Sequence, residues 1–114
     1  YLSKDITPKA KANMLLIDWS VFMANSATGQ LSTALFQDST ADAIAANGQG
    51  YRTADDYSTR SGMYVMRAGT VSATTFKVHG GNNNAGTSSF GGSGGNRQFG
   101  GAAASQLRIT EIMG

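Results

Sequence analysis

The alternating stretch from Met14 to Ala24 restricts the fold of this chain more than any other feature of the sequence. Every second residue in it is large and apolar: Leu15, Ile17, Trp19, Val21 and Met23. A period of two places these side chains on one face of a β-strand. Met14, Leu16 and Phe22 make the opposite face partly apolar as well. The pattern predicts a strand with a well-marked inner face, whose outer face is covered at its ends by a neighbour or another subunit.

Helix signals are scarce in the rest of the chain, while strand signals recur. Apolar residues seldom repeat at a spacing of three or four, and the 15 glycines are spread where helix interiors would have to be. Alternation and β-branched or aromatic residues predict further strands. These lie at Leu31–Gln37, Gly62–Ala68, Thr70–His79 and Leu107–Ile112. The stretch Ala43–Ala46 fits either a short strand or one helical turn.

Turn-forming residues indicate how these strands connect. The segment Asn25–Gln30 predicts a hairpin between the first long strand and the strand at 31–37. A turn near Ala68 and Gly69 joins the strands at 62–68 and 70–79. The fold class predicted for residues 1–114 is a single all-β domain, an antiparallel β-sandwich of roughly six or seven strands.

Two polar segments are expected at the surface of this sandwich. Tyr51–Arg60 carries the neighbouring acids Asp55 and Asp56 and reads as a surface loop. Gly80–Gly101 is rich in glycine, yet the chain resumes after it with a strand. Long loops that return to a sheet are usually functional or ordered by assembly.

The composition excludes several classes of partner. Charged residues make up only 14% of the chain, so its surface must be covered by small and amide side chains, which suits large protein contacts. Basic residues are scattered from Lys4 to Arg108 without a basic stripe, which argues against nucleic-acid binding. The longest apolar run, Met14–Ile17, is far short of the ~20 residues that span a bilayer, so we expect no membrane insertion.

Patterns that carry catalysis or metal binding are missing from the sequence. His79 is the only histidine, there is no cysteine, and no nucleophile or carboxylate stands beside His79. Neither Asp55 and Asp56 nor Asp38 and Asp42 fit a calcium loop or a glycosidase pair. We therefore expect no catalytic residue, no metal site, no cofactor and no enzymatic activity.

The order of segments resembles the carboxy-terminal domain of bacteriophage tail fibres and related virion proteins. The resemblance runs from about Thr7 to Met113. It is carried by TPKAKANMLLIDWSVFM, TALFQDSTADAIAANG, AGTVSATTFKVHGGNNNAGTSSFGG and SQLRITEIMG. It implies a jelly roll similar to the heads of tumour necrosis factor and complement C1q, assembled as a homotrimer. A jelly roll has eight strands, one or two more than the sequence indicates, so we expect the chain to be the C-terminal part of a longer one.

The resemblance also implies a function and a place. The chain would be the distal trimeric domain of a tail fibre or spike on the virion surface, mediating attachment to the host. Its partners would be copies of itself, other virion proteins, and a host cell-surface glycan or an outer-membrane component. The alternative is a capsid-decorating or fibre-capping structural protein without receptor binding. The candidate receptor-binding residues lie in the polar segments: Tyr51, Arg52, Tyr57, Asn82, Asn83, Asn84, Phe90 and Arg97.

Overall fold

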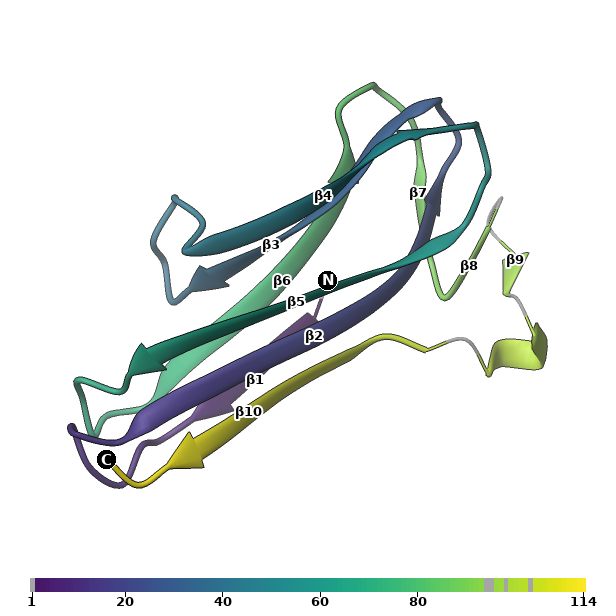
Figure 1. The fold of residues 1–114 in the computed structure, drawn as a ribbon. Coiled ribbons are helices and arrows are strands. Elements are labelled where there is room, and N and C mark those ends of the chain that lie inside the picture. Colours follow the sequence, from purple (N-terminus) through teal and green to yellow (C-terminus); the bar gives the residue numbers. More distant parts are fainter. Residues whose placement is uncertain (1, 94–95, 98, 103) are drawn as a thin grey trace.

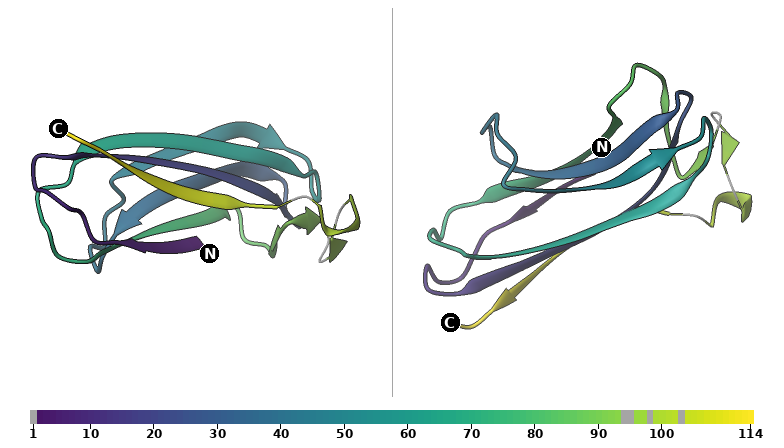
Figure 2. Two further views of the ribbon diagram at one scale, coloured as in Figure 1. Left: turned by 90° about the horizontal axis from the view of Figure 1, so that it is seen from below. Right: turned by 45° about the horizontal axis from the view of Figure 1, so that its top comes forward.

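The chain folds into two facing antiparallel sheets, which Figures 1 and 2 show as two layers. The computed structural model describes residues 2–93, 96–97, 99–102 and 104–114, and at 49–52, 96 and 101 it describes the backbone alone. The first sheet has the order β1 (Leu2–Ile6), β6 (Thr74–Asn82), β3 (Gly29–Gln37) and β4 (Ala45–Arg52). The second has the order β10 (Gln106–Ile112), β2 (Met14–Asn25) and β5 (Ser58–Arg67). The predicted all-β class with antiparallel sheets is confirmed.

The inner face of β2 forms the centre of the core, as its alternation predicts. Leu15, Ile17, Trp19, Val21 and Met23 are each 0–3% exposed. From the facing sheet they meet buried residues of β3 and β6: Leu31, Leu35, Phe76 and Val78. Burying a large apolar side chain contributes roughly 1.5 to 3 kcal/mol relative to leaving it exposed. This double layer is therefore the main source of stability.

A series of hydrogen bonds that begins at the buried Trp19 joins the two sheets. The indole Nε1 donates to Thr33 Oγ1 on β3 at 2.9 Å, and that hydroxyl donates to Asn47 Oδ1 on β4 at 2.6 Å. Asn47 Nδ2 then donates to the carbonyl of Ser61 on β5, which belongs to the same sheet as Trp19. The Trp19 ring lies directly on Gly62, where any Cβ would overlap it. The polar atoms of this core are thus satisfied by one another.

The predicted hairpin between the first long strand and the strand at 31–37 is wrong, although both strands exist. β2 pairs with β10, β5 and β7 (Ser88–Phe90), whereas β3 pairs with β4 and β6. The turn after Asn25 therefore carries the chain from one sheet to the other. Likewise β5 and β6 belong to opposite sheets. Across the sandwich β2 faces β3 and β6, and β5 faces β3 and β4.

Two segments differ from the sequence expectations. Leu2–Ile6 forms β1 on the edge beside β6, although its sequence LSKDI lacks an apolar pattern. β4 begins at Ala45 as a strand and continues through Arg52, so the expected loop at Tyr51–Arg60 shrinks to a turn before Ser58. Backbone pairing continues to Arg52, which pairs with Gly29. The strand is therefore longer than the strand preferences of its residue types predict.

The glycine-rich segment after β6 is ordered by pairing within the chain. It contains β7, β8 (Gly92–Ser93), β9 (Asn96–Arg97) and a short 3₁₀ turn, η1 (Phe99–Gly101). At Gly80 a Cβ would lie 3.0 Å from the Phe90 ring and 3.1 Å from the Met23 sulfur, so glycine is what allows these side chains to pack over β6. Figure 1 shows this segment at the end of the sandwich away from the C-terminus.

Candidate functional site

The outer face of the β10–β2–β5 sheet carries exposed apolar side chains at one end. Cross-strand pairing sets Leu16 beside Val65 and Met14 beside Ile112, and Met63 lies one row further along. Met63 is 65% exposed, Val65 51% and Ile112 48%, and the two β2 residues are half-buried. We call Met14, Leu16, Met63, Val65 and Ile112 the apolar patch. Contiguous apolar surface of this kind usually marks an interface.

The middle of the same face is polar but carries little net charge. Arg108 on β10 forms an ion pair with Asp18 on β2 at 3.1 Å, a directly paired cross-strand position. The next row pairs Ser20 with Gln106 and Ser61. Because Arg108 and Asp18 neutralise each other, a similar face can approach without strong repulsion.

At the far end of this face three aromatic rings form a cluster. Phe22 lies 5.1 Å from Tyr57 and 6.3 Å from Phe99 between ring centroids, and Tyr57 lies 6.0 Å from Phe99. Tyr57 is 41% exposed and Phe99 66%. Edge and tilted ring contacts of this kind hold the turn before β5 and the η1 turn against β2.

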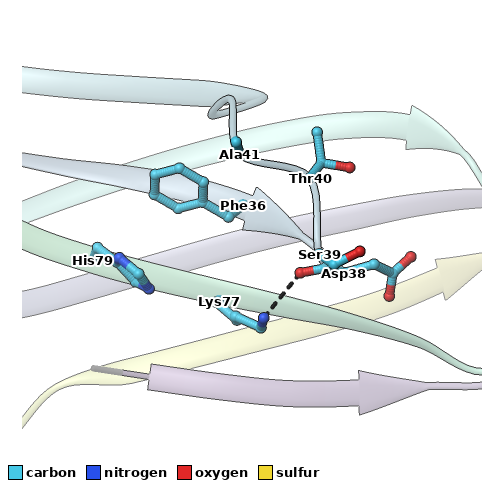
Figure 3. Close-up of a pocket in the computed structure, with 7 residues that line it drawn as sticks. All are labelled: Phe36, Asp38, Ser39, Thr40, Ala41, Lys77 and His79. Atoms are coloured by element: carbon cyan, nitrogen blue, oxygen red, sulfur yellow. Dashed lines mark hydrogen bonds between the residues drawn. The ribbon is translucent and has the colours of Figure 1, made fainter.

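The opposite outer face, on the β1–β6–β3–β4 sheet, is polar and contains a pocket of about 390 Å³. Figure 3 shows the pocket between β6 and the loop that follows β3. Phe36 on β3 and His79 on β6 form one wall, with their ring centroids 4.8 Å apart. Lys77 lies beside them, and the loop contributes Ser39 and Thr40.

Asp38 fixes the loop that borders this pocket. Its φ of 53° lies in the left-handed region, a strained conformation for a non-glycine residue. Four contacts to β6 hold it there. The Asp38 amide donates to the Thr75 carbonyl at 2.8 Å, and the carboxylate accepts from the Thr75 amide at 2.8 Å and the Thr74 hydroxyl at 2.9 Å. Lys77 Nζ donates to the Asp38 carbonyl at 2.9 Å.

The three consecutive asparagines among the candidate receptor-binding residues contact the chain's own backbone. Asn82 and Asn84 donate from their amides to the carbonyls of Ala27 and Thr28, at 2.9 and 2.6 Å. Asn83 Oδ1 accepts from the Gln30 amide at 2.8 Å. These contacts clamp the turn between β2 and β3, a structural role that their sequence does not reveal.

The other candidates gather near the same end of the sandwich. Tyr51 and Arg52 pair through their backbone with Gln30 and Gly29, beside the clamped turn, and their side chains lie outside the described part. Tyr57 belongs to the aromatic cluster. Phe90 is partly buried against the core, and Arg97 is exposed on β9.

The pocket residues were not among the candidates from sequence. The alternation over 74–79 correctly places Lys77 and His79 on the outer face, where both lie in the structure. An aromatic residue in a strand is more often part of the core than of the surface, and Phe36 departs from this rule. Its place in the alternation, one residue after the buried Leu35, was the signal that it faces outward.

The described residues contain no group of three or more His, Asp or Glu side chains placed to hold a metal ion. Among these same residues no helix has the length and apolar character needed to cross a membrane. No protein-family model matches the chain, and no curated protein matches it significantly. The two outer faces and the end of the sandwich that carries the turn after Asn25 are therefore the features that bear on function.

Proposed function

We propose that the chain is a self-assembling attachment module, the trimeric jelly-roll domain at the distal end of a phage tail fibre or spike. The observation that carries the proposal is the apolar patch on the β10–β2–β5 face. Outer faces of antiparallel sheets are normally polar where water covers them. A sheet with apolar side chains on both faces is best accounted for by a subunit packed on the outer one.

The order of the strands supports the jelly-roll part of the proposal. An eight-stranded jelly roll has two sheets of four strands. Here the orders β1–β6–β3–β4 and β10–β2–β5 are those of a jelly roll that lacks one strand beside β10 and opposite β1. Inner-facing side chains at this corner, such as Ile6 and Ile109, are only partly buried.

A second copy of the chain is the partner that best fits the apolar patch. The patch adjoins the neutralised pair of Asp18 and Arg108, and Arg67, which pairs with Met14 at its edge, donates to the carbonyl of Ala12. The low charge of the whole chain suits burial in an assembly as well. The number of copies, three, comes from the resemblance to fibre domains.

Attachment to a host surface is supported by where the loops lie. The apolar patch occupies the half of β2 that begins at Met14, whereas the turn after Asn25 and its neighbours lie at the other end. An assembly through the patch leaves this loop end open to a host glycan or an outer-membrane component. A capsid-decorating or fibre-capping protein is the second candidate, because the same patch would serve it equally well.

Light scattering on the purified chain tests the assembly. We expect a mass near that of three chains. Val65→Glu should reduce it to one chain and weaken association by roughly 100-fold or more, because a charge would be buried at the interface. Ala46→Glu is the matched control, since Ala46 is exposed on the opposite outer face, and it should leave the mass unchanged.

A monomeric wild-type chain, or equal effects of the two substitutions, would contradict assembly through the patch. The attachment role is tested separately by competition between the soluble trimer and intact virions for host cells. A trimer that neither binds cells nor competes would favour the capping or decorating role.

A further inference from the structure

We propose that the pocket between β6 and the loop after β3 binds an acidic saccharide, a pyranose ring that carries a carboxylate. This inference rests on the proposed attachment function and adds the class of ligand. The pocket lies on the outer face of the β1–β6–β3–β4 sheet, opposite the face that carries the apolar patch. It therefore remains open when copies assemble through the patch.

The size and the wall of the pocket fit one or two sugar rings. A volume of about 390 Å³ lies at the lower end of the range for small-molecule sites. The rings of Phe36 and His79 are inclined by 42° with centroids 4.8 Å apart, so the apolar phenyl ring lies beside a more polar imidazole. Ala34 pairs with His79 across the strands, and its small side chain leaves the rings accessible. The face of an aromatic ring such as Phe36 suits apolar contact with the C–H groups of a pyranose.

Lys77 and Asp38 both line the pocket, and the position of Lys77 is what favours an anionic ligand. Lys77 Nζ donates to the carbonyl of Asp38, a neutral acceptor that does not cancel its charge. The Asp38 carboxylate is turned away from Lys77 in Figure 3 and accepts from Thr74 and Thr75 instead. The ammonium group has three donors, so it can still bind a carboxylate on the ligand.

The loop is held in place before any ligand arrives. Asp38 is fixed to β6 by the contacts to Thr75, and the Thr40 amide donates to the Gln37 carbonyl at 3.2 Å within the turn. Ser39 and Thr40 are exposed and place hydroxyl groups at the rim. A loop that is already ordered loses little conformational entropy on binding, which favours recognition by such a small site.

The test is titration with trigalacturonate at constant pH and salt, with its fully methyl-esterified form as the neutral probe. Backbone amide shifts in an NMR spectrum report binding at Ser39, Thr40 and His79. We expect these shifts with the acid and not with the ester. Lys77→Gln should weaken binding by about tenfold or more, since a charge-assisted contact is lost. Phe36→Leu, which keeps apolar bulk but removes the ring, should weaken it as well.

Lys11→Gln is the control for nonspecific attraction, because Lys11 is an exposed lysine outside the pocket. Absence of shifts with the acid, equal binding of the ester, or equal losses for Lys11→Gln and Lys77→Gln would each overturn the inference. The pocket belongs to one chain, so the titration is repeated on Val65→Glu. If a monomer binds the acid, the saccharide site is supported although the proposed assembly is wrong. If a trimer forms but does not bind the acid, only the saccharide site is refuted.

Discussion

The two outer faces of the sandwich differ although both belong to alternating strands. On the β10–β2–β5 sheet the outward residues include Met63 and Val65, which are more than half exposed. On the opposite sheet the corresponding positions are Thr75, Lys77 and His79. Alternation fixes which residues face the core. The outward residues are not constrained by the core, so their polarity depends on whether water or another molecule covers the outer face. The apolar face is therefore the one that we propose for assembly, and the polar face the one that we propose for ligand binding.

The last strand shows the same contrast within two residues. Glu111 pairs with Leu15 and so lies on the inner side at the end of β10, where Lys9 and Asn13 donate to its carboxylate at 2.7 and 2.6 Å. Ile112, the next residue, lies on the outer side and is 48% exposed. A charge on the inside and an isoleucine on the outside reverse the usual arrangement. The reversal is understandable if the outer face is buried in an assembly.

The comparison of the two faces holds only if both sheets unfold as one cooperative unit. Trp19→Ala tests this, and it has the largest expected effect on the free energy of unfolding. Trp19 is 3% exposed and bridges the sheets through its ring and its N–H group. We expect a loss of about 3 to 5 kcal/mol in the free energy of unfolding. Urea unfolding followed by circular dichroism measures it.

Trp19→Phe separates the two contributions of the indole. It keeps most of the apolar bulk over Gly62 but removes the donor to Thr33. A smaller loss than for Trp19→Ala is expected. A normally stable Trp19→Ala chain would show that the sheets are not held together through this residue.

A smaller effect should distinguish the inner from the outer side of β3. Thr33 is 1% exposed, accepts from Trp19 and donates to Asn47, whereas its neighbour Ser32 is exposed. Thr33→Val keeps the shape but removes the partner of the buried Trp19 N–H and of the half-buried Asn47 Oδ1. Its expected cost is about 1 to 3 kcal/mol. Ser32→Ala should stay within about 0.5 kcal/mol, and equal thermal shifts for both variants would contradict this series of hydrogen bonds.

The sequence predicts those parts of this molecule that depend on local alternation. The inner face of Met14–Asn25, the strand at 106–112 and the partly apolar outer face follow directly from side-chain order. The pairing of strands does not, because a short turn such as the one after Asn25 can return the chain to the same sheet or cross to the other. Only the burial of both apolar faces decides between these outcomes.

The candidate site is less predictable for a related reason. Asn82, Asn83 and Asn84 look like exposed recognition residues, yet their amides bind backbone groups that lie more than fifty positions away. The pocket is formed by residues of the loop after β3 and of β6, so no contiguous sequence motif predicts it. Long-range contacts of this kind become visible only once the register between β3 and β6 is known.

The smallest expected effect concerns Glu111, at the point where the two faces reverse. Hydrogen bonds from the Asn13 side chain and then from the Lys9 amide lower the pKa of the Glu111 carboxyl below its usual value. Its contribution to stability is therefore complete above the pKa of the unfolded chain and is lost as the pH falls through the lower folded value. Glu111→Gln should be less stable than the wild type at neutral pH, and the difference should shrink in acid. Thermal unfolding from pH 7 to pH 2 measures the trend. A difference that stays constant over this range would mean that the carboxylate does not hold the Lys9–Asn13 loop against β10, and that the inward position of Glu111 needs another explanation.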